Sequence, residues 1–119
     1  MNARLSTHAL DTMNGCPAAG LRIELARIGN DGVAERILET RTNQDGRTDQ
    51  PLLEGAALKI GTYQLVFHVG EYFAGKGVTL PDPSFLDQVP VRFGVGDPEK
   101  SYHVPLLVSP WSYSTYRGS

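Results

Sequence analysis

Few side chains in this sequence could act on a substrate, and they lie far apart along the chain. The three histidines are His8, His68 and His103. An unperturbed imidazole titrates near pH ~6.5, so it can take up or release a proton at neutral pH. Arg47 follows an apparent Asp45–Gly46 turn, and its forked guanidinium could hold an anion. No local spacing rule joins these residues, so the pattern alone does not assemble a site.

Each candidate also has an ordinary structural interpretation. His68 lies next to a turn in FHVGEYF and is expected to be a partly exposed packing residue. The single cysteine, Cys16, lies between a glycine and a proline in an expected turn, which favours a structural role over a thiol nucleophile. Taken alone, His8, Arg47 and His103 would more often be structural or solvated. A zinc variant using His8 and His103 stays open, to be tested with a chelator, although dense metal-ligand motifs are absent.

Composition indicates a folded, water-soluble domain. The chain has 119 residues, 40% hydrophobic and 20% charged, which suits one domain spanning 1–119 with a real core. A net charge of −2 offers no basic surface for nucleic acid. With no run of ~18 apolar residues and no signal peptide, we expect no membrane association and a cytoplasmic location.

Period-two alternation of apolar residues predicts an antiparallel β-sandwich or barrel. Turn sequences rich in Asn, Asp, Gly and Pro separate the alternating runs. One helical turn is expected at GEYFAGKG, residues 70–77. The expected strands are LRIEL (21–25), TYQLVFHV (62–69), VPVRFGV (89–95) and YHVPLLVS (102–109), with weaker candidates at LSTHALDT (5–12), VAERILETRT (33–42) and YSTYR (113–117).

The strand expected at 102–109 has two unusual features. Pro105 cannot donate a ladder hydrogen bond, so it predicts an edge or a bulge near His103. The outward face of this strand carries His103 and Leu107, and a second subunit could cover this partly apolar face. In the 5–12 strand, His8 shares a face with Ser6 and Leu10.

Four stretches together resemble the transthyretin-like family of 5-hydroxyisourate hydrolases. They are LSTHALDTMNGCPAAG, TNQDGRTD, FHVGEYF and YHVPLLVSPWSYSTYRGS. The resemblance runs from end to end of the chain. Its most specific element is the terminal YRGS, which distinguishes these hydrolases from the hormone carriers that share their fold.

The resemblance implies an all-β, transthyretin-like sandwich of two four-stranded antiparallel sheets with one short helix. It implies a homotetramer with active sites at the dimer–dimer interface. The implied reaction is cofactor-independent hydrolysis of 5-hydroxyisourate to 2-oxo-4-hydroxy-4-carboxy-5-ureidoimidazoline, a step of urate degradation in purine catabolism, without a metal. The implied catalytic residues are His8, Arg47 and His103, and the implied substrate-binding residues are His8, Arg47, Tyr116, Arg117, Gly118 and Ser119.

The implied roles follow from the chemistry of these side chains. His103 and His8 would activate water and move protons, with the choice of base left open. Arg47 would stabilise the oxyanion, and the backbone and carboxylate at Ser119 would close the pocket. Two alternatives remain: a small-molecule binding protein of the same fold, and a monomeric sandwich domain used for adhesion or attachment.

Overall fold

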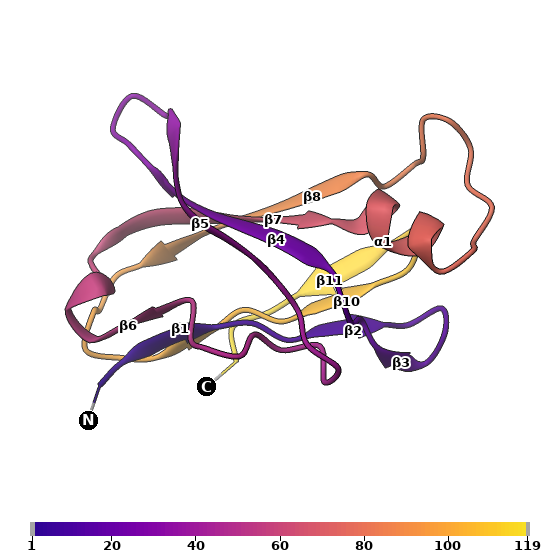
Figure 1. The fold of residues 1–119 in the computed structure, drawn as a ribbon. Coiled ribbons are helices and arrows are strands. Elements are labelled where there is room, and N and C mark those ends of the chain that lie inside the picture. Colours follow the sequence, from indigo (N-terminus) through magenta and orange to yellow (C-terminus); the bar gives the residue numbers. More distant parts are fainter. Residues whose placement is uncertain (1, 119) are drawn as a thin grey trace.

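Alternating apolar residues form two facing layers of strands in the computed structural model, which describes residues 2–118 (Figure 1). The first layer is a four-stranded antiparallel sheet in the order β5-β4-β7-β8. Its strands are β4 (Arg22–Ile28), β5 (Ala34–Arg41), β7 (Gly61–His68) and β8 (Gln88–Val95). The four strands lie where the sequence pattern predicted them.

The second layer consists of two short sheets. One has the order β6-β1-β9 and the other the order β11-β10-β2-β3. The elements are β1 (Arg4–Ser6), β2 (Ala9–Asp11), β3 (Cys16–Pro17), β6 (Leu53–Glu54), β9 (Tyr102–His103), β10 (Leu106–Val108) and β11 (Tyr113–Thr115). Cys16 therefore lies in a strand, just after the turn in which it was predicted.

The sandwich is confirmed, but the second layer differs from a single antiparallel sheet. Both β1–β9 and β2–β10 are parallel pairs. The interruption lies at Pro105, which lacks the N–H that a continuous ladder needs. Hydrogen bonds from Val104 N to the Ser6 carbonyl and from Leu106 N to the His8 carbonyl, both 2.9 Å, join the segments across the break. The predicted irregularity beside His103 is thus confirmed.

The core lies between the two layers. Its largest fully buried side chains include Tyr63, Phe67 and Phe73, and Leu5 and Leu106 contribute from the second layer. Burying one such side chain fully stabilises the fold by about 1.5–3 kcal/mol. The inward faces of both layers therefore fix which side chains point outward.

Helix α1 (Val69–Gly75) follows β7 directly and begins one residue before the predicted 70–77. It buries Val69, Tyr72 and Phe73, and the left-handed backbone of Gly77, at φ +79°, lies just beyond its end. A single 3-10 turn covers Gly55–Ala57. Within residues 2–118, no helix has the length and apolarity that crossing a bilayer requires.

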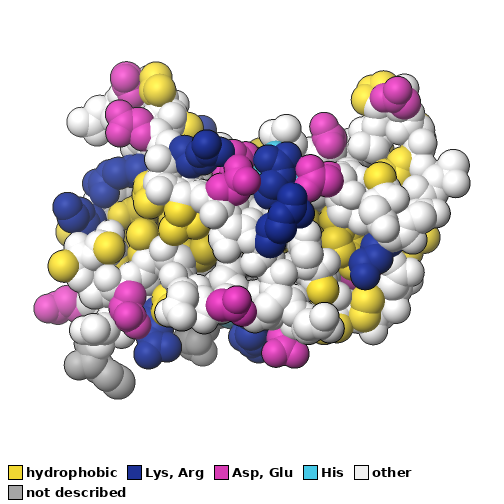
Figure 2. Space-filling view, viewed as in Figure 1, with side chains coloured by type: hydrophobic (Ala, Val, Ile, Leu, Met, Phe, Trp, Pro, Cys, Tyr) yellow, Lys and Arg dark blue, Asp and Glu magenta, His cyan; other side chains and the backbone are white. Residues whose placement is uncertain are grey.

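The prediction that His68 is a partly exposed packing residue was wrong. Its exposed fraction is 6%, and both ring nitrogens are hydrogen-bonded. Arg22 donates to Nδ1 at 3.2 Å, so Nε2 carries the hydrogen that Glu24 accepts at 2.8 Å. His68, followed by Arg36, lowers the pKa of Glu24. Figure 2 shows acidic and basic side chains interleaved along this layer, where Arg22 also pairs with Glu71 at 3.1 Å.

A buried carboxylate fastens α1 to the second layer. Asp11 is 1% exposed and accepts hydrogen bonds from Asn14 N (2.9 Å), Asn14 Nδ2 (2.7 Å) and the Tyr72 hydroxyl (2.8 Å). Burial alone would raise the pKa of Asp11, but the bonds from Asn14 and Tyr72 outweigh it and lower that pKa. The stability that the ionised Asp11 carboxylate contributes is therefore fully present above the ordinary carboxyl pKa of 3.8. It is lost as the pH falls through the lowered pKa of Asp11 in the folded protein.

We expect Tyr72→Phe to lower the free energy of unfolding by about 1.5–3 kcal/mol at neutral pH, because the Asp11 carboxylate loses a donor while it stays buried. Denaturant unfolding measures this loss. Tyr113→Phe is the matched control, since Tyr113 is 44% exposed and its hydroxyl has no hydrogen bond to residues 2–118. Equal stability of the two variants would contradict the anchoring role of Asp11.

Candidate active site

The outward side of the second layer brings four of the predicted site residues together. His8 and Arg47 form an isolated antiparallel bridge, and His103 forms another with Gly118. His103 is also the register partner of Ser6. Directly paired residues present side chains to the same face, and so do alternate residues of one strand. His8, Arg47 and His103 therefore share one face, although they come from three separate segments.

His8 is half-buried, and one of its ring nitrogens is already occupied. Nε2 lies 2.9 Å from the Asp45 carbonyl oxygen. A carbonyl can only accept, so Nε2 carries the hydrogen and the neutral ring has its lone pair on Nδ1. His8 can therefore offer one nitrogen, Nδ1, to a proton or a substrate.

The tight turn before Arg47 is docked against β2. Asn43 Oδ1 accepts hydrogen bonds from the amides of Asp45 (2.9 Å) and Arg47 (3.2 Å), while Ala9 N donates to the Gly46 carbonyl at 2.8 Å. Gly46 has φ +76°, and a Cβ there would collide with the Ala9 carbonyl oxygen. The backbone of Arg47 is thus fixed, while its side chain is exposed beside His8.

His103 is held on two sides. Its Nδ1 lies 2.9 Å from Ser6 Oγ, and its carbonyl accepts a 2.8 Å hydrogen bond from Gly118 N. A Cβ at position 118 would lie 2.8 Å from His103 Cδ2, so the tail passes the ring at a distance that excludes any side chain. Ser6 and Gly118 together set the orientation of the ring.

The electrostatic surroundings keep His103 neutral. Burial lowers its pKa most, the positive charge of Arg47 lowers it further, and the neighbouring His8 adds to the effect. At pH 7 this imidazole is therefore unprotonated and able to accept a proton. In contrast with His68, its Nε2 has no hydrogen bond to residues 2–118 and remains available.

The other predicted tail residues lie away from the histidines. The Arg117 guanidinium is stacked over the Tyr102 ring, 4.3 Å from its centroid, and Tyr116 is 61% exposed. Both line a hollow of about 230 Å³ that also includes Phe93 and Gly94 of β8. In this chain, Gly118 is thus the tail residue next to His103, and Ser119 lies outside the described residues.

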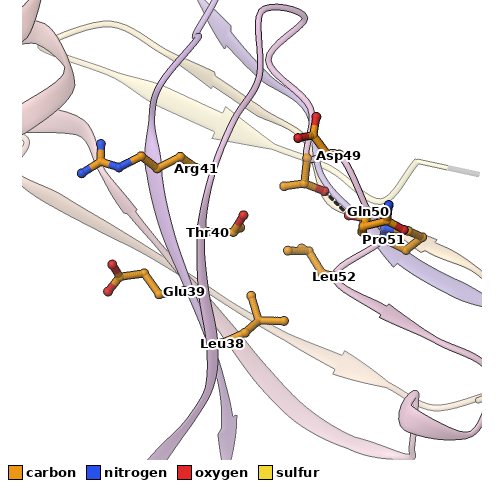
Figure 3. Close-up of a pocket in the computed structure, with 9 residues that line it drawn as sticks. Leu38, Glu39, Thr40, Arg41, Asp49, Gln50, Pro51 and Leu52 are labelled. Carbon is orange, nitrogen blue, oxygen red and sulfur yellow. Dashed lines mark hydrogen bonds between the residues drawn. The ribbon is translucent and has the colours of Figure 1, made fainter.

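The segment after Arg47 has a hollow on each side. One, of about 310 Å³, is lined by Arg4, Ser6, Thr7 and residues 47–51, so it adjoins the site. The other, of about 270 Å³, lies between residues 38–41 of β5 and residues 48–52 (Figure 3). Ser6, the partner of His103, and Arg47, the partner of His8, line only the first hollow, which is therefore the better place for a substrate to meet the site.

Two groups that orient the histidines were not predicted from the sequence. The Ser6 hydroxyl could have been predicted, because Ser6 lies two residues before His8 on the same strand face. The Asp45 carbonyl could not, because every residue has a backbone carbonyl and the residue type does not show which one will bind a side chain. Among residues 2–118, no group of three or more His, Cys, Asp or Glu side chains is placed to hold a metal ion.

Comparisons with known proteins identify relatives of this chain. The model of the HIUase/Transthyretin family matches residues 5–118. The chain is 57% identical to 5-hydroxyisourate hydrolase 2 of Rhizobium meliloti (strain 1021), covering 99% of this chain and 98% of that protein. It is 55% identical to 5-hydroxyisourate hydrolase of Pseudomonas aeruginosa, in an alignment that covers 98% of this chain and 91% of that protein.

Solved structures agree with this relationship. The crystal structure of (S)-allantoin synthase matches with a TM-score of 0.93 and 49% identity over 99% of this chain, which spans 44% of that one. The structure of Klebsiella pneumoniae 5-hydroxyisourate hydrolase matches with a TM-score of 0.81 and 34% identity. The match covers 98% of this chain and 99% of that one. Sea bream transthyretin in complex with thyroxine matches with a TM-score of 0.85 and 26% identity. The match covers 98% of this chain and 95% of that one.

We expect Gly118→Ala to displace the tail from His103, because the added methyl group meets the ring. An NMR pH titration should then show the His103 pKa moving up toward its ordinary value, as burial of the ring decreases. Gly75→Ala is the control, since a Cβ there meets nothing within 4 Å. An unchanged His103 titration in Gly118→Ala would show that the close approach does not hold the ring.

Proposed function

The chain belongs to the HIUase/Transthyretin family, and on that premise we propose that it hydrolyses 5-hydroxyisourate. The observation that carries the proposal is the shared face of His8, Arg47 and His103, on a chain with relatives named for this activity. Two imidazoles, each with one nitrogen free, can move protons at neutral pH. An arginine beside them can hold the anionic or carbonyl oxygens of a small heterocycle. The product is 2-oxo-4-hydroxy-4-carboxy-5-ureidoimidazoline.

In the proposed reaction, water attacks a ring carbonyl of the substrate. His103, neutral at pH 7, takes a proton from the water as the oxygen bonds to the carbonyl carbon. The Arg47 guanidinium stabilises the negative charge that develops on the carbonyl oxygen. The C–N bond then breaks, the ring nitrogen leaves with a proton supplied by the histidine pair, and the carbonyl carbon becomes a carboxylate. His8, through Nδ1, is the partner that relays the proton.

We propose that the protein is a homotetramer with its active sites between dimers. The face that carries His8 and His103 also carries Leu10 and Leu107, which are partly exposed in the single chain. A second copy on this face would remove these apolar side chains from water and enclose the site. Enclosure strengthens the electrostatic effect of Arg47, because the local dielectric falls. We further propose that the reaction needs no cofactor or metal and takes place in the cytoplasm.

The same fold serves a thyroxine-bound transthyretin, so fold alone would also suit a binding protein. Binding a ligand does not require a neutral histidine with a free nitrogen beside an arginine. The lowered His103 pKa therefore favours hydrolysis over simple binding.

We expect the protein to accelerate the ultraviolet decay of 5-hydroxyisourate generated from urate by a urate oxidase. His103→Ala and Arg47→Ala should each slow this reaction by about 100-fold or more, because each removes a group that acts in the transition state. Arg36→Ala is the control for loss of a surface arginine, since Arg36 is exposed on β5 of the other layer and pairs with Glu24 and Glu39. Decay no faster than in a protein-free cuvette would refute the hydrolase proposal.

Removing residues 116–119 should abolish turnover while the core stays folded, because the buried side chains of both layers lie before position 116. The activity assay is paired here with thermal unfolding and analytical ultracentrifugation, which should find a folded tetramer. Full activity in the truncated protein would exclude a role for the tail in the site. A monomeric intact protein would exclude the proposed assembly.

A further inference from the structure

We propose that Ser6 is a positioning residue that accepts a hydrogen bond from Nδ1–H of His103 and so leaves the Nε2 lone pair free for the attacking water. The hydroxyl oxygen lies 2.9 Å from Nδ1. This inference rests on the proposed hydrolysis and adds a group that acts through His103. It also identifies which nitrogen of His103 takes the proton.

The position of Ser6 is fixed by the backbone on both sides of the contact. Leu5 pairs with Tyr102 and Ser6 with His103 in the same parallel ladder, and Val104 N donates to the Ser6 carbonyl at 2.9 Å. Leu5 and Tyr102 are both buried, so a shift of either strand would disturb the core. The hydroxyl and the ring therefore meet without a large loss of side-chain freedom.

The other edges of the ring leave a single nitrogen for the substrate. Gly118 lies against Cδ2, and Ser6 occupies Nδ1. Nε2 has no hydrogen bond to residues 2–118, so it is the nitrogen free to meet a water molecule. A base needs its lone pair on that nitrogen, which requires the hydrogen of the neutral ring to be on Nδ1.

The charges around His103 favour this tautomer. Arg47 and His8 are the charged or titratable groups that act on the ring from the neighbouring segments. The two other cations nearby have partners of their own: Arg117 stacks on the Tyr102 ring, and Arg4 pairs with Glu54 at 3.3 Å. In the proposed arrangement the Arg47 guanidinium acts at the free Nε2 edge. A positive charge there favours a lone pair over an N–H, which directs the hydrogen of the neutral ring to Ser6.

The two possible directions of the Ser6–His103 bond predict opposite effects of removing the hydroxyl. If the hydroxyl accepts, it also stabilises the imidazolium, which always carries Nδ1–H, and its loss lowers the His103 pKa. If the hydroxyl donates, it stabilises the neutral ring, and its loss raises that pKa. The sign of the shift thus decides the direction of the bond.

We expect Ser6→Ala to lower kcat by about 10- to 100-fold with little change in KM, a part of the ~100- to 10,000-fold that a positioned acid–base group contributes. The acid limb of the kcat/KM profile should move to lower pH, together with the His103 pKa measured by NMR. Ser6→Thr, which keeps the hydroxyl, should restore most of the rate. Thr62→Ala controls for loss of an exposed hydroxyl on β7 of the other layer and should leave both readouts unchanged.

Nitrogen-15 shifts of His103 in the wild-type protein test the tautomer without any substitution. A protonated Nδ1 and an unprotonated Nε2 in the neutral ring support the proposal even if Ser6→Ala fails to fold. The reverse assignment, an upward pKa shift in Ser6→Ala, or an unchanged rate in that variant would each overturn it. If the wild-type protein fails to hydrolyse 5-hydroxyisourate while the tautomer is as expected, the proposed function fails and the positioning of His103 stands.

Discussion

The site depends on the pairing of a segment near the start of the chain with one near its end. Ser6 and His103 are 97 positions apart in the sequence, yet their strands lie in one parallel ladder. Parallel pairing joins distant segments, because two parallel strands need a long connection between them. The buried hydroxyl of Thr7 strengthens this contact by donating to the Val104 carbonyl at 2.7 Å. The intervening chain supplies the first layer and the core that keeps the two segments in place.

Pro105 makes the local geometry of this pairing unusual. A proline in the middle of a strand removes a ladder hydrogen bond, so the layer divides into two short sheets at that point. The neighbouring amides of Val104 and Leu106 still bond to carbonyls across the break. The result is a ladder fixed on either side of Pro105, with His103 held next to the break by its pairing with Ser6 and Gly118. A ring in that position can be oriented by packing on both edges, which a flexible loop would not provide.

Much of the fold could be predicted from the sequence because period-two alternation reports directly which face is buried. The strands of the first layer, the outward placement of His8 and His103, and the break at Pro105 all follow from that pattern. The burial of His68 could not be predicted, because its partners Arg22 and Glu24 lie on another strand and no local pattern records them. The grouping of the site residues likewise depended on resemblance to a family, since their register is set by pairing over long sequence distances.

The same physical chemistry explains why the three histidines differ in what they can do. His68 is buried between an arginine that donates to one nitrogen and a carboxylate that accepts from the other, so neither nitrogen is free. His8 and His103 each use one nitrogen to fix the ring and leave the other without a bond to residues 2–118. Burial, then the charge of Arg47 and the neighbouring His8, lowers the pKa of His103. A histidine that is fixed in orientation, neutral and open at one nitrogen meets the requirements of a general base, and His103 combines these three properties.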